Sequence, residues 1–199
     1  MVDNGSHDGS LEFLARRPGT RVLRLRGNPG HGTGLDVGFL MARTEFVVAM
    51  DIDAFPIRAR WLDDLLEPLD HGFTMSGAHV KRDYVHPCCL AMRTERFVRR
   101  GMSFKARYRD HYGDVGELMA AGDSGPFHYL EPTSVRGPGA VGSVFGDLVY
   151  HNFYSTRFSL TRTDVIDDVV GKDDPRLAWS EAVRRYLGAE APGRAAPGG

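Results

Sequence analysis

The chain has 199 residues, enough for one domain with a substantial core and too few for two full-sized domains. Its 25 basic and 26 acidic side chains give a formal net charge of −1, so no electrostatic argument favours a nucleic-acid-binding protein. The only cysteines, Cys88 and Cys89, are adjacent, which argues against both a disulfide framework and a zinc site. No apolar stretch of about 18 residues predicts a transmembrane helix, and no secretory signal is found, so we expect a cytoplasmic protein.

The first elements expected are a strand ending at Val2, a turn-rich loop over 3–10 and a helix over 11–17. Apolar and basic residues alternate over 20–26, which predicts a strand with one wet face. Residues 28–38 are rich in glycine, as a backbone must be where it turns through positive φ or passes close to a ligand. This segment is not a P-loop, because the lysine and hydroxyl that close that motif are missing.

The centre of the pattern is a continuous apolar run over 46–50, typical of a strand buried on both faces. Asp51 and Asp53 follow at its carboxyl end, the edge where ligands bind in open α/β sheets. With Ile52 pointing the other way, strand geometry would place both carboxylates on one face, where a divalent cation relieves their repulsion. Hard oxygen ligands favour Mg²⁺ or Mn²⁺ shared with substrate phosphates. Two solvated loop carboxylates are the alternative interpretation, and Pro56 is expected to end the strand.

Further along the chain, apolar spacing predicts a helix over 61–69, a strand over 73–80, a strand running into a helix over 86–97, and a strand over 127–133. His86 lies beside the cysteines, but the spacing is wrong for a zinc knuckle and favours a buried strand of small residues.

Asp114 stands before an amphipathic helix, where it is either an N-cap or a carboxylate directed at a ligand, with Glu117 as the alternative acid. A glycine-rich loop over 136–146 is either a lid or a linker. Helices are expected around 164–170 and from Pro175 to Leu187, followed by a disordered tail over 188–199.

Several of these segments, in this order and spacing, resemble the family 2 glycosyltransferases of the GT-A fold. They are residues 2–10, 28–38, 45–55 and 61–69. The family usually reads Asn-x-Gly-x-x-x-Ala-x-Asn-x-Gly in the second segment; this chain keeps Asn28, Gly30 and Gly38 but has Gly34 and Asp36 at the other two positions. The resemblance, which extends to about Phe158, implies an α/β fold with a mainly parallel central sheet and helices on both faces.

The same resemblance implies a single GT-A-like domain over 1–187. In the family an earlier strand and its helix precede the loop at 3–10, so this domain would be incomplete at its N-terminus. The implied reaction is a metal-dependent, inverting transfer of a sugar from a nucleotide-diphosphate donor to an acceptor hydroxyl. The acceptor would be a glycan, a lipid-linked molecule or a small molecule, and a lipid-linked acceptor would bring the protein to a membrane surface.

Specific roles also follow from the resemblance. Mn²⁺ or Mg²⁺ would be held by the DXD motif, Asp51 and Asp53, and by His151, which is otherwise a core histidine. Asp114 would act as general base on the acceptor, and Arg157 would stabilise the departing diphosphate. Donor contacts are expected from Asp3, Ser6, Asn28, Gly30 and Asp51.

Two other functions fit part of the pattern. A metal-dependent nucleotidyltransferase would share the aspartate pair, but it needs a basic glycine-rich loop near the amino end, where the sequence has no lysine. A catalytically inactive remnant that binds a nucleotide or a protein partner is favoured by the missing first strand.

Overall fold

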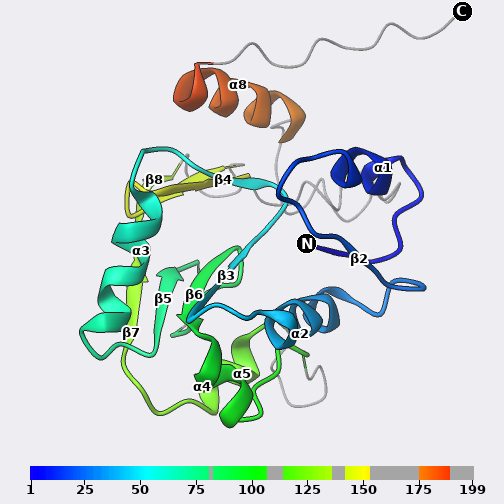
Figure 1. Ribbon diagram of the computed structural model, residues 1–199. Coiled ribbons are helices and arrows are strands. Elements are labelled where there is room, and N and C mark those ends of the chain that lie inside the picture. The colour runs from blue at the N-terminus through cyan, green and yellow to red at the C-terminus, as the bar shows by residue number, and fades with distance from the viewer. Residues whose placement is uncertain (81–82, 107–113, 136–141, 153–174, 189–199) are drawn as a thin grey trace, which may run out of the picture.

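The computed structural model describes residues 1–80, 83–106, 114–135, 142–152 and 175–188 (Figure 1). Its elements are β1 (Val2–Asp3), α1 (Ser10–Ala15), β2 (Leu23–Arg24), α2 (His31–Met41), β3 (Phe46–Met50), β4 (Ala54–Pro56), α3 (Trp61–Asp70), β5 (Met75–Ala78), β6 (Cys89–Arg93), α4 (Thr94–Arg99), α5 (Glu117–Ala121), β7 (Phe127–Leu130), β8 (Pro132–Val135), β9 (Ser143–Phe145), β10 (Val149–His151) and α8 (Pro175–Leu187). Some predictions lie outside the described residues, namely Arg157, the helix at 164–170, most of the glycine-rich loop and the tail beyond Gly188.

The main sheet has the order β3-β6-β5-β7, so the apolar strand β3, expected at the centre, lies at one edge of the described sheet. Strand β6 pairs antiparallel with both β3 and β5, whereas β5 and β7 are parallel. Strands β3, β5 and β7 therefore run in one direction, as the predicted parallel sheet requires, with β6 reversed between them. The reversal follows from the direct connection between β5 and β6, which contains no crossover helix and so returns the chain antiparallel.

Helices cover both faces of the main sheet, as predicted (Figure 1). Successive residues of β3 point to opposite faces. Val47 and Ala49 belong to the apolar cluster that contains Phe97 of α4, together with side chains of α2 and α5. Val48 belongs instead to the cluster that contains Leu65 of α3. The continuous apolar run of β3 is thus explained by burial against helices on both sides.

A second sheet, which the sequence analysis did not predict, has the order β4-β10-β9-β8 and is antiparallel throughout. Helix α8 packs against it, with the Trp179 ring 5.1 Å from that of Phe55 and 6.4 Å from that of Tyr150. Pro56 was expected to end the strand that carries the aspartates; the chain instead forms β3 and β4 on either side of a turn, and Pro56 is the last residue of β4. A proline is tolerated there because β4 is an edge strand.

Most local predictions agree with the remaining elements. The helices predicted over 61–69 and 175–187 are α3 and α8, and the strand and helix predicted over 86–97 are β6 and α4. The strand predicted over 127–133 is divided between β7 and β8, which belong to different sheets. Within the described parts of the chain, no helix has the length and apolar character needed to cross a membrane.

Candidate metal centre

Asp51 and Asp53 lie in the turn that connects β3 of the main sheet to β4 of the second sheet. Strand β3 ends at Met50, and the N–H of Ala54 donates to the carbonyl oxygen of Asp51 at 3.0 Å, closing the turn. Ile52 is 77% exposed, whereas the Asp53 residue is 8% exposed. The expectation that strand alternation aligns the carboxylates is therefore wrong, because this turn, and not a strand, positions them.

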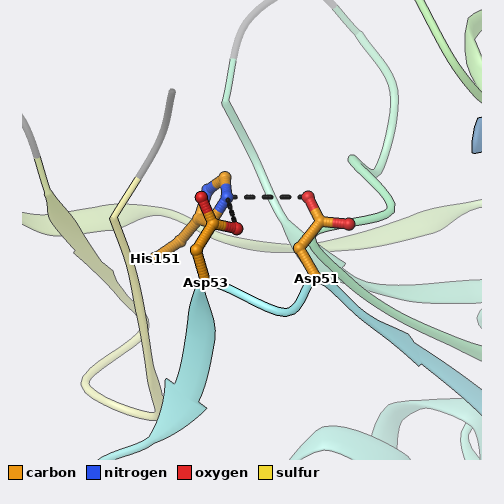
Figure 2. Close-up of side chains that lie close together, drawn as sticks. All are labelled: Asp51, Asp53 and His151. Atoms are coloured by element: carbon orange, nitrogen blue, oxygen red, sulfur yellow. Dashed lines mark ion pairs between the residues drawn. The ribbon is translucent and has the colours of Figure 1, made fainter. Parts of the chain in front are cut away.

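His151, the last residue of β10 in the second sheet, contacts the two aspartates. Strand β10 pairs antiparallel with β4 so that His151 lies opposite Ala54, and the N–H of Asn152 donates to the Asp53 carbonyl at 2.8 Å. The His151 Nε2 atom is 3.2 Å from Asp53 Oδ1 and 3.5 Å from Asp51 Oδ2. Figure 2 shows the imidazole facing both carboxylates. Pairing between β4 and β10 thus brings together residues that are far apart in the sequence.

The donor atoms of these three residues suit a divalent cation. One ligand atom from each of Asp51, Asp53 and His151 lies within 4.8 Å of the others. The two carboxylate oxygens are suitable ligands for both Mg²⁺ and Mn²⁺. The imidazole nitrogen is a better ligand for Mn²⁺ than for Mg²⁺. Two carboxylates in a largely buried position also repel each other, and a cation is the simplest relief. The residues present therefore fit the metal that the sequence analysis predicted.

His31, the first residue of α2, contacts the cluster through Asp51. Its Nε2 atom lies 3.3 Å from Asp51 Oδ1. The hydrogen bond to Asp51 raises the pKa of His31; burial opposes this, and the charges of Asp51, Asp114 and Asp53 add to it. The sequence analysis did not single out His31, because no local pattern links it to the aspartates.

Asp114 lies close to this cluster and is held by two aromatic side chains. The Tyr84 hydroxyl donates to Asp114 Oδ2 at 2.8 Å, and His86 Nε2 is 4.0 Å from the same oxygen. The N–H of Cys88 donates to His86 Nδ1 at 3.1 Å, so a neutral His86 ring carries its proton on Nε2, toward Asp114. The rings of His86 and His151 have centroids 6.3 Å apart. Asp114, the predicted general base, therefore lies beside the candidate metal centre.

Two interpretations of this region are corrected by the structure. Asp114 is not the N-cap of the next helix, because α5 begins at Glu117 and its N-cap is Gly116 with φ 87°. Glu117, the alternative acid, is 8% exposed and accepts a hydrogen bond from the Asp114 N–H at 3.4 Å. His86 is not in a strand of small residues; it precedes β6 and faces Asp114. The sequence analysis missed Tyr84 altogether.

Asp3 and Ser6, two of the residues predicted to contact the sugar donor, form one small motif at the end of β1. The Asp3 carboxylate accepts the Ser6 N–H at 3.2 and 3.3 Å, and Arg24 Nε lies 3.9 Å away. Hydrogen bonds from Ser6 lower the pKa of Asp3, although burial opposes the shift. Asp3 is therefore ionised at neutral pH and can accept further hydrogen bonds.

The glycine-rich segment lies next to this motif. The Asn28 side chain accepts the N–H of Gly30 at 3.0 Å, and Gly30 has φ 95°, a conformation that favours glycine. Asn4 donates to the Gly30 carbonyl at 3.4 Å, which connects the loop after β1 to the start of α2. Four residues outside the aspartate turn were predicted to contact the sugar donor. They lie in or directly beside two neighbouring loops: Asp3, Ser6, Asn28 and Gly30.

The two departures from the family pattern have structural explanations. A Cβ at Gly34 would lie 2.7 Å from Asn4 Oδ1, so an alanine there would displace this side chain. Asp36 accepts hydrogen bonds of 2.7 Å from both the Ser103 hydroxyl and the Phe104 N–H. It thereby fixes α2 to the segment that follows α4.

Comparison with known proteins adds a family to this geometry. Residues 1–111 match the family described as glycosyl transferase family 2. No curated protein matches the chain. A solved structure of S. aureus TarS 1-349 in complex with UDP-GlcNAc is similar at a TM-score of 0.46 and 12% identity. That match covers 95% of this chain but only 63% of the TarS chain.

Proposed function

The chain belongs to glycosyl transferase family 2, in agreement with the GT-A α/β fold predicted from its sequence, and from this premise we propose that it transfers a sugar from a nucleotide-diphosphate donor to an acceptor hydroxyl. One observation carries the proposal. Asp51, Asp53 and His151 converge beyond the carboxyl end of β3, with ligand atoms within 4.8 Å of one another. That edge is where an α/β sheet binds its ligand.

In this proposal Asp51, Asp53 and His151 hold Mn²⁺ or Mg²⁺. The bound cation would neutralise negative charge on the departing diphosphate. Asp53 and His151 are the more buried of the three ligands, with side chains 10% and 5% exposed, and Asp51 is 17% exposed. This gradient favours Asp51 as the residue that also contacts the donor.

The nucleoside would bind over the two loops that precede and follow β2. Asp3 is kept ionised by its bonds to Ser6 and can accept hydrogen bonds from a base or ribose. Asn28 and Gly30 lie immediately before His31, which contacts Asp51, so these loops lie beside the aspartate turn. The donor would therefore extend from the loops toward the metal ligands.

Asp114 is the proposed general base. The acceptor oxygen would bond to the anomeric carbon as the carbon–oxygen bond to the diphosphate breaks, and the acceptor proton would pass to Asp114. Attack opposite the leaving group makes the transfer inverting. The Tyr84 hydroxyl and the His86 ring contact Oδ2 of Asp114, and the Val115 N–H donates to Oδ1 at 2.9 Å. These contacts would hold the carboxylate in one orientation beside the acceptor. Arg157, proposed to stabilise the diphosphate, remains a prediction from the family resemblance.

The test is thermal unfolding of the full chain with UDP-, GDP- and dTDP-linked sugars, UDP-GlcNAc included, each with and without Mn²⁺. We expect one nucleotide to raise the Tm only when Mn²⁺ is present, because a ligand that binds the folded state stabilises it. Product analysis of that pair should then detect release of a nucleoside diphosphate. Release of inorganic pyrophosphate from a nucleoside triphosphate would favour a nucleotidyltransferase instead, and no shift with any donor would contradict the proposal.

A further inference from the structure

We infer that His31 is a positioning residue of the metal site, which orients the Asp51 carboxylate for the cation. The inference rests on the metal-binding part of the proposed function and assigns a role to a residue from a separate helix. Asp51 binds two imidazoles through different oxygens. Oδ1 lies 3.3 Å from His31 Nε2, and Oδ2 lies 3.5 Å from His151 Nε2.

The division of the two oxygens matters because Asp51 lies on a turn outside both sheets. Rotation about the side-chain bonds of an aspartate would exchange its oxygens and move them away from a shared ligand. The contact of His31 with Oδ1 restricts that rotation and leaves Oδ2 on the side of His151 and Asp53. Hydrogen bonds to metal-binding carboxylates commonly set metal affinity in this way.

His31 itself is held in place by the close packing of α2. A Cβ at Gly32 would lie 2.6 Å from the Phe104 carbonyl oxygen, so the helix contacts this segment with no space to spare. Asp36, one turn further along, binds the Ser103 hydroxyl and the Phe104 N–H. The first turn of α2 therefore presents the imidazole from a fixed backbone, although the side chain is half-exposed.

A second histidine–carboxylate pair shows why this contact differs from an ordinary surface pair. His79 lies 3.0 Å from Glu131, whose side chain is 62% exposed. Solvated carboxylates of that kind gain little from one added partner. Asp51 is only 17% exposed and shares its other oxygen with a candidate metal ligand. Loss of the His31 contact should therefore change the geometry of the site.

The test is Mn²⁺ titration of the full chain, followed by the loss of the EPR signal of the hydrated ion. We expect His31→Ala to weaken Mn²⁺ binding by about 10- to 100-fold, as for other residues that orient metal ligands. His31→Gln should retain most of the affinity, because its amide nitrogen can donate in place of Nε2. His71→Ala, which alters an exposed histidine bonded to the Glu67 carbonyl on α3, is the matched control and should bind as the wild type does.

Each outcome bears on the inference. Equal affinity in His31→Ala and wild type would overturn it, and an equal loss in His31→Ala and His31→Gln would reject the hydrogen-bonding role. No Mn²⁺ binding by the wild type would remove both the inference and the metal-dependent part of the proposed function. Mn²⁺ binding that follows the expected order without turnover of any nucleotide-sugar would support the inference and contradict only the proposed transfer.

Discussion

Two groups of charged side chains in this protein differ in how their charges are balanced. Asp123, after α5, has a fully buried side chain that meets the Arg96 guanidinium of α4, with Nε 3.0 Å from Oδ2. Burial would raise the pKa of Asp123, but Arg96 lowers it below its ordinary value. Asp51 and Asp53, in contrast, lie together beside histidines only, among the charged partners described.

The difference separates a structural ion pair from a candidate functional site. A buried carboxylate with a permanent cation is neutralised within the fold and needs no ligand. Two carboxylates that face imidazoles can bind a cation between them, because an imidazole is charged only when it is protonated. Substitutions in the first group should therefore lower stability and leave metal binding intact. Substitutions in the second group should weaken metal binding and change stability little.

The largest effect is expected from Asp53→Asn. Loss of a proposed metal ligand that is buried should reduce sugar transfer by roughly 10³-fold, because metal-ion catalysis is worth several kcal/mol. Stability without metal should change by less than about 1 kcal/mol, since the lost attraction to His151 is offset by relief of repulsion with Asp51. Turnover and urea unfolding measure the two effects. Asp63→Asn, in an exposed pair with Arg60, is the control, and full turnover in Asp53→Asn would disprove the metal role.

Arg96→Ala tests the balanced group. It leaves the Asp123 carboxylate buried without its guanidinium, which should cost about 2–3 kcal/mol of unfolding free energy. Mn²⁺ should still raise the Tm of the variant as it does for the wild type, because Arg96 is not near the metal ligands. Urea unfolding with and without Mn²⁺ makes the comparison. A variant as stable as the wild type would mean that the pair contributes nothing to the fold.

The same pair has a defined pH dependence. The pKa of Asp123 is lowered in the folded state, so its stabilisation is present above the unfolded value of 3.8. It is lost as the pH falls through the lower folded pKa. In Arg96→Ala burial without the guanidinium should raise the pKa of Asp123 above 3.8, so the difference in unfolding free energy between wild type and variant should begin to decrease above about pH 4 and continue to fall below it. A difference that disappears near pH 6 would point to a histidine instead.

Parts of this molecule with strong local patterns were predictable from the sequence. The apolar stripe from Trp61 to Leu69 predicted α3, and the apolar run at 46–50 predicted β3, because periodicity and burial depend on neighbouring residues. The predicted α8 likewise begins at Pro175, a favoured first residue of a helix. These elements needed no knowledge of distant contacts.

Other parts depended on contacts that no local pattern encodes. Strand β4 is short and contains Pro56, so it was not predicted, and the second sheet was missed with it. The approach of His151 to Asp53 depends on pairing between β4 and β10, and it was inferred from family resemblance alone. His31 and Tyr84 meet the site from separate elements. Their contacts arise from the tertiary fold, which single-residue patterns cannot specify.

Asp114 is an intermediate case between the two charged groups, since its described partners include the Tyr84 hydroxyl, the His86 imidazole and the Val115 N–H. Asp114→Asn keeps the shape of the side chain but cannot accept the acceptor proton. We expect kcat to fall about 10²-fold, the lower range for general base catalysis. The Mn²⁺-dependent Tm increase with the donor should be unchanged, because Asp114 is not proposed to bind metal or nucleotide. Loss of donor binding in this variant would reassign Asp114 to the donor site.

The smallest effect is expected from Tyr84→Phe, which removes one hydroxyl that donates to Asp114 at 2.8 Å. A hydrogen bond to a charged group contributes about 1.5 kcal/mol, so kcat should fall about 10-fold if the hydroxyl orients the base. The KM for the donor should not change, because Tyr84 contacts Asp114, which is proposed to act on the acceptor. Tyr186→Phe on α8, whose ring packs 6.1 Å from that of Tyr150, is the matched control and should retain kcat. A merely structural hydroxyl would lower the Tm of Tyr84→Phe and leave kcat per folded molecule unchanged. The described contacts that orient Asp114 would then be those with His86 and the Val115 N–H.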